Sequence, residues 1–135
     1  LLTSYAQRRK VLLAVMLIVV RNFRDRGGAM PADDIRTQLD LPTRIVNDVL
    51  FQLVQAGQLI AVRSGDGERE TAFTPAHDIA SMTVYGVLEA VEDAGQTSFA
   101  LNENRELASV DRELERVKQA ARMSGDNLRL VDIPE

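Results

Sequence analysis

The chain has 135 residues, of which 45% are hydrophobic and 27% charged, as expected for one globular domain with its own core. It contains no cysteine, which excludes disulfides, iron–sulfur clusters and thiolate metal sites. The formal net charge of −4 is unevenly spread, because residues 1–28 sum to +5 and the remainder to −9. A basic N-terminal segment followed by an acidic remainder is typical of a chain leaving a membrane on its cytoplasmic side, and equally of an ordinary helix with solvated ends.

The first predicted element is a helix over residues 5–24, which Ser4 and Gln7 can begin as a capping box. Its centre, residues 11–20, is ten consecutive apolar residues. Those residues would span roughly 15 Å, about half of a bilayer core, so they do not form a transmembrane segment. A helix that is apolar all round must be covered on every side. We expect the following helices to cover one face, and the C-terminal helix or another subunit to cover the other.

Residues 31–75 have the order of a helix-turn-helix followed by a wing. A short helix over 34–39 and a corner over 40–42 precede a longer helix that ends before Gly57. Strands over 59–63 and 71–74 then enclose a glycine-rich loop, residues 64–69. The sequence therefore predicts a mainly α fold, a winged helix-turn-helix with a two-stranded β wing and an additional C-terminal helix, in one domain over 1–123.

The longer helix is strongly amphipathic. At 100° per residue its apolar side chains fill one half of the wheel, and polar side chains fill the other half. Phe51 breaks this pattern, since it projects among the polar residues. An exposed aromatic side chain on a face with little charge predicts a protein contact, unless the first or last helix covers it and makes Phe51 core. The candidate protein-contact face is Arg44, Asp48, Phe51 and Gln55.

Two helices are predicted after the wing, over residues 81–94 and 105–123. The second has apolar residues spaced three, four and three apart, which is a short heptad seam. So short a seam needs a partner surface, so we expect a homo-oligomer, most simply a dimer. Residues 124–135 are predicted to be a flexible tail. The candidate self-association residues are Leu107, Val110, Leu114 and Val117.

Catalytic chemistry has few candidates in this chain. The only histidine, His77, stands alone in a predicted loop, and Asp33 and Asp34 suit the first turn of a helix, where acids complement the dipole. Asp66, Glu68 and Glu70 form an acidic wing tip without a closed ligand cage. We therefore assign no catalytic, cofactor-binding or metal residue and expect no cofactor.

Charge argues against DNA binding when it is counted along the sequence. Residues 31–75 carry four arginines and seven acids, a net charge of −3. Most affinity for DNA comes from Lys and Arg side chains that replace counterions on phosphates. On this count the net charge of the predicted winged helix is negative, which is the wrong sign for DNA binding. The sequence does not decide whether the chain binds RNA.

Several motifs in chain order resemble one membrane-protein family. After the basic apolar helix come Pro31 to Leu39, Leu41 to Val46, and Leu53 to Leu59, and later Thr74-Pro75-Ala76 and Met82-Thr83-Val84. Together they resemble the cytosolic C-terminal extension of the ribonuclease BN-like (YihY/BrkB) family over about residues 5–95. Rrf2-type transcription regulators share the same order of elements. They often carry a cysteine cluster and a basic reading helix, which this sequence lacks.

The resemblance implies a membrane-embedded parent whose bilayer part precedes Leu1, with this domain on the cytoplasmic side of the inner membrane. The expected function is then a cytosolic regulatory or protein-interaction domain. The family name also implies tRNA-processing ribonuclease activity, which no residue here supports. The alternative is a DNA-binding transcription regulator of the winged-helix, Rrf2-like type.

Overall fold

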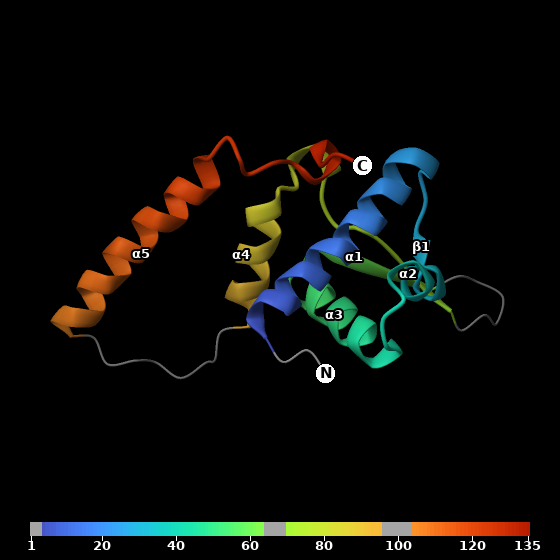
Figure 1. Cartoon of the computed structure of the whole chain (residues 1–135), viewed down its shortest axis with the longest axis horizontal. Coiled ribbons are helices and arrows are strands. Elements are labelled where there is room, and N and C mark those ends of the chain that lie inside the picture. The colour runs from blue at the N-terminus through green and yellow to red at the C-terminus, as the bar shows by residue number, and fades with distance from the viewer. Residues whose placement is uncertain (1–3, 64–69, 96–103) are drawn as a thin grey trace.

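The computed structural model describes residues 4–63, 70–95 and 104–135. Its central element is α1 (Tyr5–Arg26), which runs through the middle of the molecule (Figure 1). The predicted cap is confirmed, since the Gln7 N–H donates to Ser4 Oγ at 3.0 Å. The helix ends at Gly27, whose φ of 71° lets its N–H reach the Phe23 carbonyl oxygen.

The helix-turn-helix follows α1 directly. Helix α2 (Ala32–Leu39) ends at Asp40, which adopts a left-handed φ of 52°, a conformation that Asp tolerates better than most residues. Helix α3 (Thr43–Gln55) starts after Pro42 and ends in a turn closed by Gly57 at φ 70°. The predicted mainly α winged-helix class is confirmed.

The sheet has three strands, one more than the predicted wing. β2 (Leu59–Arg63) and β3 (Thr71–Pro75) form the predicted hairpin, and β1 (Met30–Pro31) adds to the other side of β3 in the antiparallel order β1-β3-β2. A strand of two residues is too short to show a periodic pattern in the sequence. Pro31 also argues against a strand except at the edge of a sheet, and β1 lies at such an edge. The wing tip, residues 64–69, lies outside the described residues.

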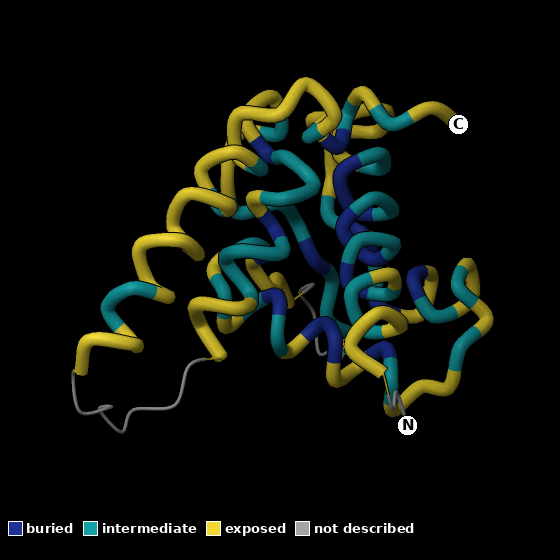
Figure 2. Tube along the Cα trace, turned by 60° about the vertical axis from the view of Figure 1, so that its left-hand side comes forward, coloured by how far each residue is buried: buried dark blue, intermediate teal, exposed yellow. Residues whose placement is uncertain are grey.

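The hydrophobic core forms where α1 packs against α3, the sheet and α4 (Val84–Ala94), and the buried stripe along α1 is dark blue in Figure 2. The described residues do not cover α1 on every side, because Leu13, Ala14, Leu17 and Ile18 are only half-buried. The fully buried side chains come from almost every element, among them Val15, Met16, Ile35, Val46, Leu53, Leu59, Val87 and Leu130.

Helix α5 (Arg105–Met123) extends away from the body and buries none of its residues (Figure 1). The short 3₁₀ helix η1 (Ile79–Ser81) precedes α4, and η2 (Leu130–Asp132) follows α5. No helix in the described part of the chain is both long and apolar enough to cross a bilayer.

The C-terminal segment is ordered against the body, so the prediction of a flexible tail over 124–135 is wrong. Leu130 is fully buried, and its N–H donates to the Met82 carbonyl oxygen at 2.8 Å. Arg21 of α1 donates to the carbonyl oxygens of Ile133 and Pro134 at 3.2 and 3.3 Å. Burial of the leucine and these long-range bonds offset the entropy that a free tail would keep.

Candidate nucleic-acid interface

The exposed face of α3 is the centre of the candidate interface. The core side of this helix is formed by Val46, Val49 and Leu53, which are fully buried. The opposite side is solvent-accessible, with Gln52 half-buried and the others exposed. We call the residues of this side the α3 face: Arg44, Asn47, Asp48, Phe51, Gln52 and Gln55.

Arg8 of α1 borders one side of the α3 face. Its Nη1 atom lies 3.2 Å from Asp48 Oδ2 and donates to Gln52 Oε1 at 2.8 Å. The arginine therefore offsets the charge of the only acidic residue on the face. No local pattern could have revealed this contact, because 40 residues separate Arg8 from Asp48.

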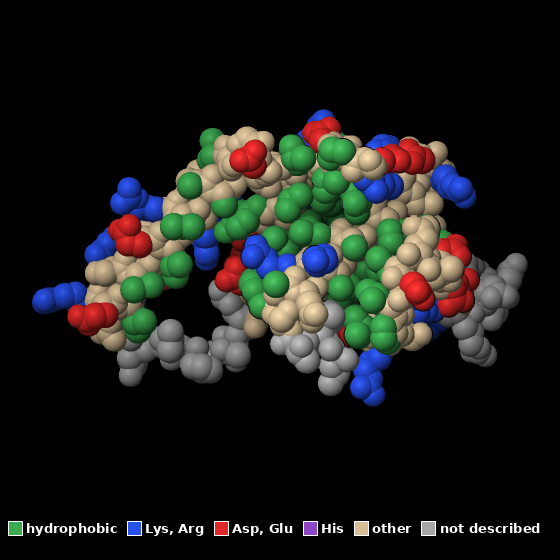
Figure 3. Space-filling model, in the orientation of Figure 1, with side chains coloured by type: hydrophobic (Ala, Val, Ile, Leu, Met, Phe, Trp, Pro, Cys, Tyr) green, Lys and Arg blue, Asp and Glu red, His purple; other side chains and the backbone are tan. Residues whose placement is uncertain are grey.

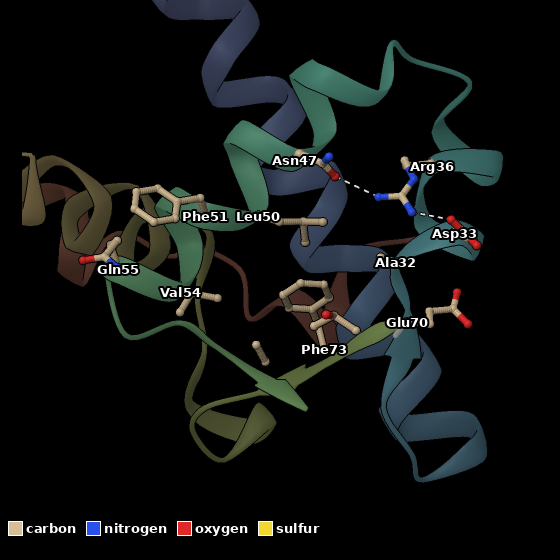
Figure 4. A pocket seen from close by; sticks show the side chains of 12 residues that line it. Ala32, Asp33, Arg36, Asn47, Leu50, Phe51, Val54, Gln55, Glu70 and Phe73 are labelled. Atoms are coloured by element: carbon tan, nitrogen blue, oxygen red, sulfur yellow. Dashed lines mark hydrogen bonds and ion pairs between the residues drawn. The ribbon is translucent and has the colours of Figure 1, made fainter. Parts of the chain in front are cut away.

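Arg36 of α2 borders the other side. Its Nη1 atom donates to Asn47 Oδ1 at 2.8 Å, and its Nη2 atom forms an ion pair with Asp33 (Figure 4). The hydrogen bond from Arg36 is the main reason why the pKa of Asp33 lies below its ordinary value. The guanidinium group is thus held in place by two partners, one of them on the α3 face.

The charge of this surface differs from the charge of the sequence window. The described arginines on and beside the α3 face are Arg8, Arg36 and Arg44, and the exposed Arg63 ends β2. Arg8 lies outside residues 31–75, so a count over that window misses it, while Asp66, Glu68 and Arg69 lie in the undescribed wing tip. The amides of Asn47, Gln52 and Gln55 can pair with base edges, and Arg44 is in the first turn of α3, where helix-turn-helix proteins place base contacts.

A groove lies beside the α3 face, between α2, α3 and the β2–β3 hairpin (Figure 4). Its volume is about 780 Å³. Leu50 and Phe73 form a buried floor, and Phe51, which is 62% exposed, stands at one end. Phe51 is therefore a surface residue of α3, and neither α1 nor α5 covers it in the described part of the chain.

The predicted self-association seam lies exposed along α5. The exposed fractions are 39% for Leu107, 53% for Val110, 50% for Leu114 and 66% for Val117. Figure 3 shows hydrophobic side chains gathered over α1 and along the edge of α5 that faces the body.

The C-terminal end of α5 is joined to α4 by an ion pair. Arg122 contacts Glu89 of α4 at 2.5 Å, and within α5 it contacts Glu115 at 3.0 Å. The hydrogen bond from Arg122 lowers the pKa of Glu89. The contact with Glu89 joins α5 to the body, and the seam residues remain exposed.

Residues weighed as catalytic or metal-binding are not brought together. His77 is exposed in the turn after β3, and Asp33 and Asp34 lie in the first turn of α2. Within residues 4–63, 70–95 and 104–135, no group of His, Asp and Glu side chains is arranged to hold a metal ion.

Comparisons with known proteins find similar folds only. No family model matches the chain, and no curated protein matches it by sequence. The structure is similar to CymR, the global cysteine regulator of B. subtilis, with a TM-score of 0.61, 16% identity, and coverage of 98% of this chain and 95% of CymR. For Staphylococcus aureus CymR the TM-score is 0.60 at 13% identity, covering 96% of this chain and 98% of that one. For a putative transcriptional regulator from Listeria innocua the TM-score is 0.60 at 17% identity, covering 93% of this chain and 82% of that one.

These findings correct the predicted family. The matched structures are a global cysteine regulator, a second CymR and a putative transcriptional regulator, and no family model supports a ribonuclease BN-like (YihY/BrkB) domain, so that assignment is wrong. The membrane-embedded parent, the location at the inner membrane and the role as a membrane protein's cytosolic domain depended on it and are wrong with it. The prediction against DNA binding is corrected as well, because the structures that this chain resembles include a putative transcriptional regulator and two CymR regulators.

Proposed function

We propose that this chain is a winged-helix DNA-binding transcription regulator that acts as a homodimer. The observation that carries the proposal is the α3 face, which has arginines from α1 and α2 on its two sides and amide side chains between them. The likeness to CymR and to the Listeria regulator supports it at the level of the fold.

Some residues would contact the bases of the DNA, and others would position the protein on its phosphate backbone. Helix α3 would enter the major groove, with Arg44 and the amides of Asn47 and Gln55 toward base edges. Arg8 and Arg36, on the borders of the face, suit phosphate contacts because each is already oriented by an α3 side chain. Phe51 can contact the methyl group of thymine.

Dimerisation would follow from the seam on α5. Helix-turn-helix regulators bind paired half-sites as dimers, so two copies must be held at a defined spacing. The seam of Leu107, Val110, Leu114 and Val117 is exposed, and two and a half heptads are too short to be stable alone. A second copy would cover both this seam and the half-buried apolar side of α1.

Selection from a randomised duplex library, followed by fluorescence anisotropy on the selected site, tests the proposal. We expect specific binding that weakens steeply with salt. Arg44→Gln should weaken binding by about fivefold to 150-fold, as for the loss of a base or phosphate contact worth about 1–3 kcal/mol.

The matched control is Arg116→Gln, which removes one positive charge from an exposed position on α5. This variant should keep near-parental affinity. Failure to enrich any sequence, or equal weakening by the two variants, would contradict the proposed interface.

A further inference from the structure

Two arginines from outside α3 bond the amide groups of α3 at their oxygen atoms. Arg36 Nη1 donates to Asn47 Oδ1 at 2.8 Å, which is drawn as a dashed line in Figure 4, and Arg8 Nη1 donates to Gln52 Oε1 at 2.8 Å. A guanidinium group has five N–H donors and no acceptor. Only the oxygen of an amide can therefore face it, so the chemistry of each contact fixes which way the amide is turned.

The NH2 group of Asn47 is left for a ligand. Asn47 is exposed on the α3 face, and its Nδ2 atom makes no hydrogen bond within the described residues. Its oxygen is already engaged, so the free part of this side chain is a donor. Gln52 is turned in the same way by Arg8, although it is half-buried.

Arg36 is held firmly enough to set this orientation. Its side chain is half-buried, and its Nη2 atom forms an ion pair with Asp33 of the same helix while Nη1 bonds Asn47. Two partners on different atoms fix the plane of the guanidinium group. These bonds use two of the five N–H groups, so the others remain for a phosphate contact.

The two purines present different edges to such a donor. Asn reads adenine by two bonds, one accepted by the amide oxygen from N6–H and one donated to N7, whereas guanine presents acceptors at both N7 and O6. The oxygen of Asn47 keeps a second lone pair. To use it, the amino group of adenine would have to lie beside the N–H groups of a cation, and donors that face each other repel. Guanine meets no such conflict.

We infer that Arg36 is a positioning residue that sets the base specificity of Asn47: it turns the amide into a donor and so selects guanine over adenine at the base that Asn47 faces. The inference rests on the proposed function, since it names the base preference of the face that would enter the major groove. Arg44 carries donors only, so it favours the same kind of edge.

Anisotropy on the selected duplex, with each base pair of a half-site exchanged in turn, locates the base that Asn47 reads. Asn47→Ala should remove discrimination at one position and leave it at the others. At that position the parent chain should bind the guanine duplex at least about fivefold more tightly than the adenine duplex. Preference of the parent for adenine, or no position at which Asn47→Ala changes the preference, would overturn the inference.

Substitution of Arg36 separates its positioning role from its charge. Arg36→Met removes every donor from the side chain and frees the Asn47 oxygen to accept from adenine, so the ratio of guanine to adenine affinity should fall about fivefold or more. Arg36→Lys keeps the charge and N–H donors and should retain the guanine preference. An unchanged ratio in Arg36→Met would overturn the inference, whatever the overall affinity becomes.

Arg63→Met is the matched control. It removes one positive charge from the exposed end of β2 and leaves the bond between Arg36 and Asn47 intact. Loss of a phosphate contact weakens binding to all sequences nearly equally, so the guanine-to-adenine ratio of this variant should equal that of the parent. A fall in the ratio as large as that of Arg36→Met would show that charge alone is responsible and would overturn the inference.

NMR of the ¹⁵N-labelled full chain tests the bond without DNA. Arg36→Met should shift the side-chain NH2 signals of Asn47, and Arg63→Met should leave them in place. Backbone signals of α1 and α4 that match the parent show that each variant is folded. Unmoved Asn47 signals in Arg36→Met would show that the bond does not form in solution and would overturn the inference.

The DNA results distinguish failure of the base preference from failure of the proposed function. If no duplex is bound, the proposed function fails, and the base preference fails with it. If duplexes are bound but adenine is accepted as well as guanine at the Asn47 position, the proposed function stands and only the role of Arg36 is refuted.

Discussion

At the scale of single residues, Arg8 adds a positive charge beside the α3 face. It bonds Asp48 and Gln52 from the first turn of another helix, and so removes the repulsion that a lone Asp48 would exert on phosphate. Both partners are partly exposed, so the pair contributes little to stability. Its importance lies in the charge that it adds to the α3 face.

Phe51 provides a test at the same scale. The side chain is 62% exposed, so Phe51→Ser should change the free energy of unfolding by no more than about 0.5 kcal/mol and leave the melting temperature nearly unchanged. The variant should nevertheless weaken binding of whatever occupies the α3 face. Whether that partner includes a protein, as first predicted from the sequence, is decided by measuring association with candidate partners.

Phe73→Ser is the control for this experiment. Phe73 is only 7% exposed and forms part of the core, so its loss should cost about 3–5 kcal/mol. Thermal unfolding followed by circular dichroism measures both variants. A fall of ten degrees or more for Phe51→Ser, on the order of 2 kcal/mol or more for a chain of this size, would refute the surface assignment.

At the scale of elements, the C-terminal segment, residues 124–135, contacts both α1 and α4. Thr83 pairs with Arg129 in an isolated β-bridge, and the Tyr85 N–H donates to Asn127 Oδ1 at 2.7 Å. The segment therefore satisfies a free N–H in the first turn of α4 as well as burying Leu130. These contacts make it part of the folded domain.

Leu130→Ala should consequently destabilise the whole domain. We expect a loss of about 2–5 kcal/mol in the free energy of unfolding, because the substitution leaves a cavity among fully buried neighbours. Leu128→Ala is a matched control, since Leu128 is 38% exposed and should lose far less. Chemical denaturation at equilibrium measures both. Similar midpoints for Leu130→Ala and the parent would mean that the tail is not docked in solution.

At the scale of the whole molecule, α5 leaves an apolar surface that a single copy does not cover. Figure 3 shows the half-buried side of α1 and the seam on α5 on the same face of the molecule. The proposed regulator needs two reading helices, and this surface is the place where a second copy can join.

Leu114→Glu should abolish dimerisation by placing a charge in the middle of the seam. Sedimentation equilibrium of the parent chain at tens of micromolar is expected to give about twice the chain mass of 15.0 kDa, and the variant should give a single chain. Arg112→Gln changes the charge by the same amount on the opposite side of α5 and should remain dimeric. A monomeric parent would remove the homodimer from the proposed function.

The sequence alone determined the features that depend on neighbouring residues. The cap at Ser4, the amphipathic period of α3, the left-handed turn at Gly57 and the β2–β3 hairpin follow from local sterics and from spacings of three, four or two residues. Together they were sufficient to predict the winged-helix class.

Only the tertiary structure decided the features that join distant parts of the chain. It placed Arg8 beside Asp48, added β1 to the sheet, docked Leu130 against the core and enclosed the groove beside α3. Each of these needs two or more segments to meet, and the free energy of such contacts depends on packing that no single segment encodes. A count of charge over residues 31–75 therefore omits Arg8, which lies outside that window and beside the α3 face.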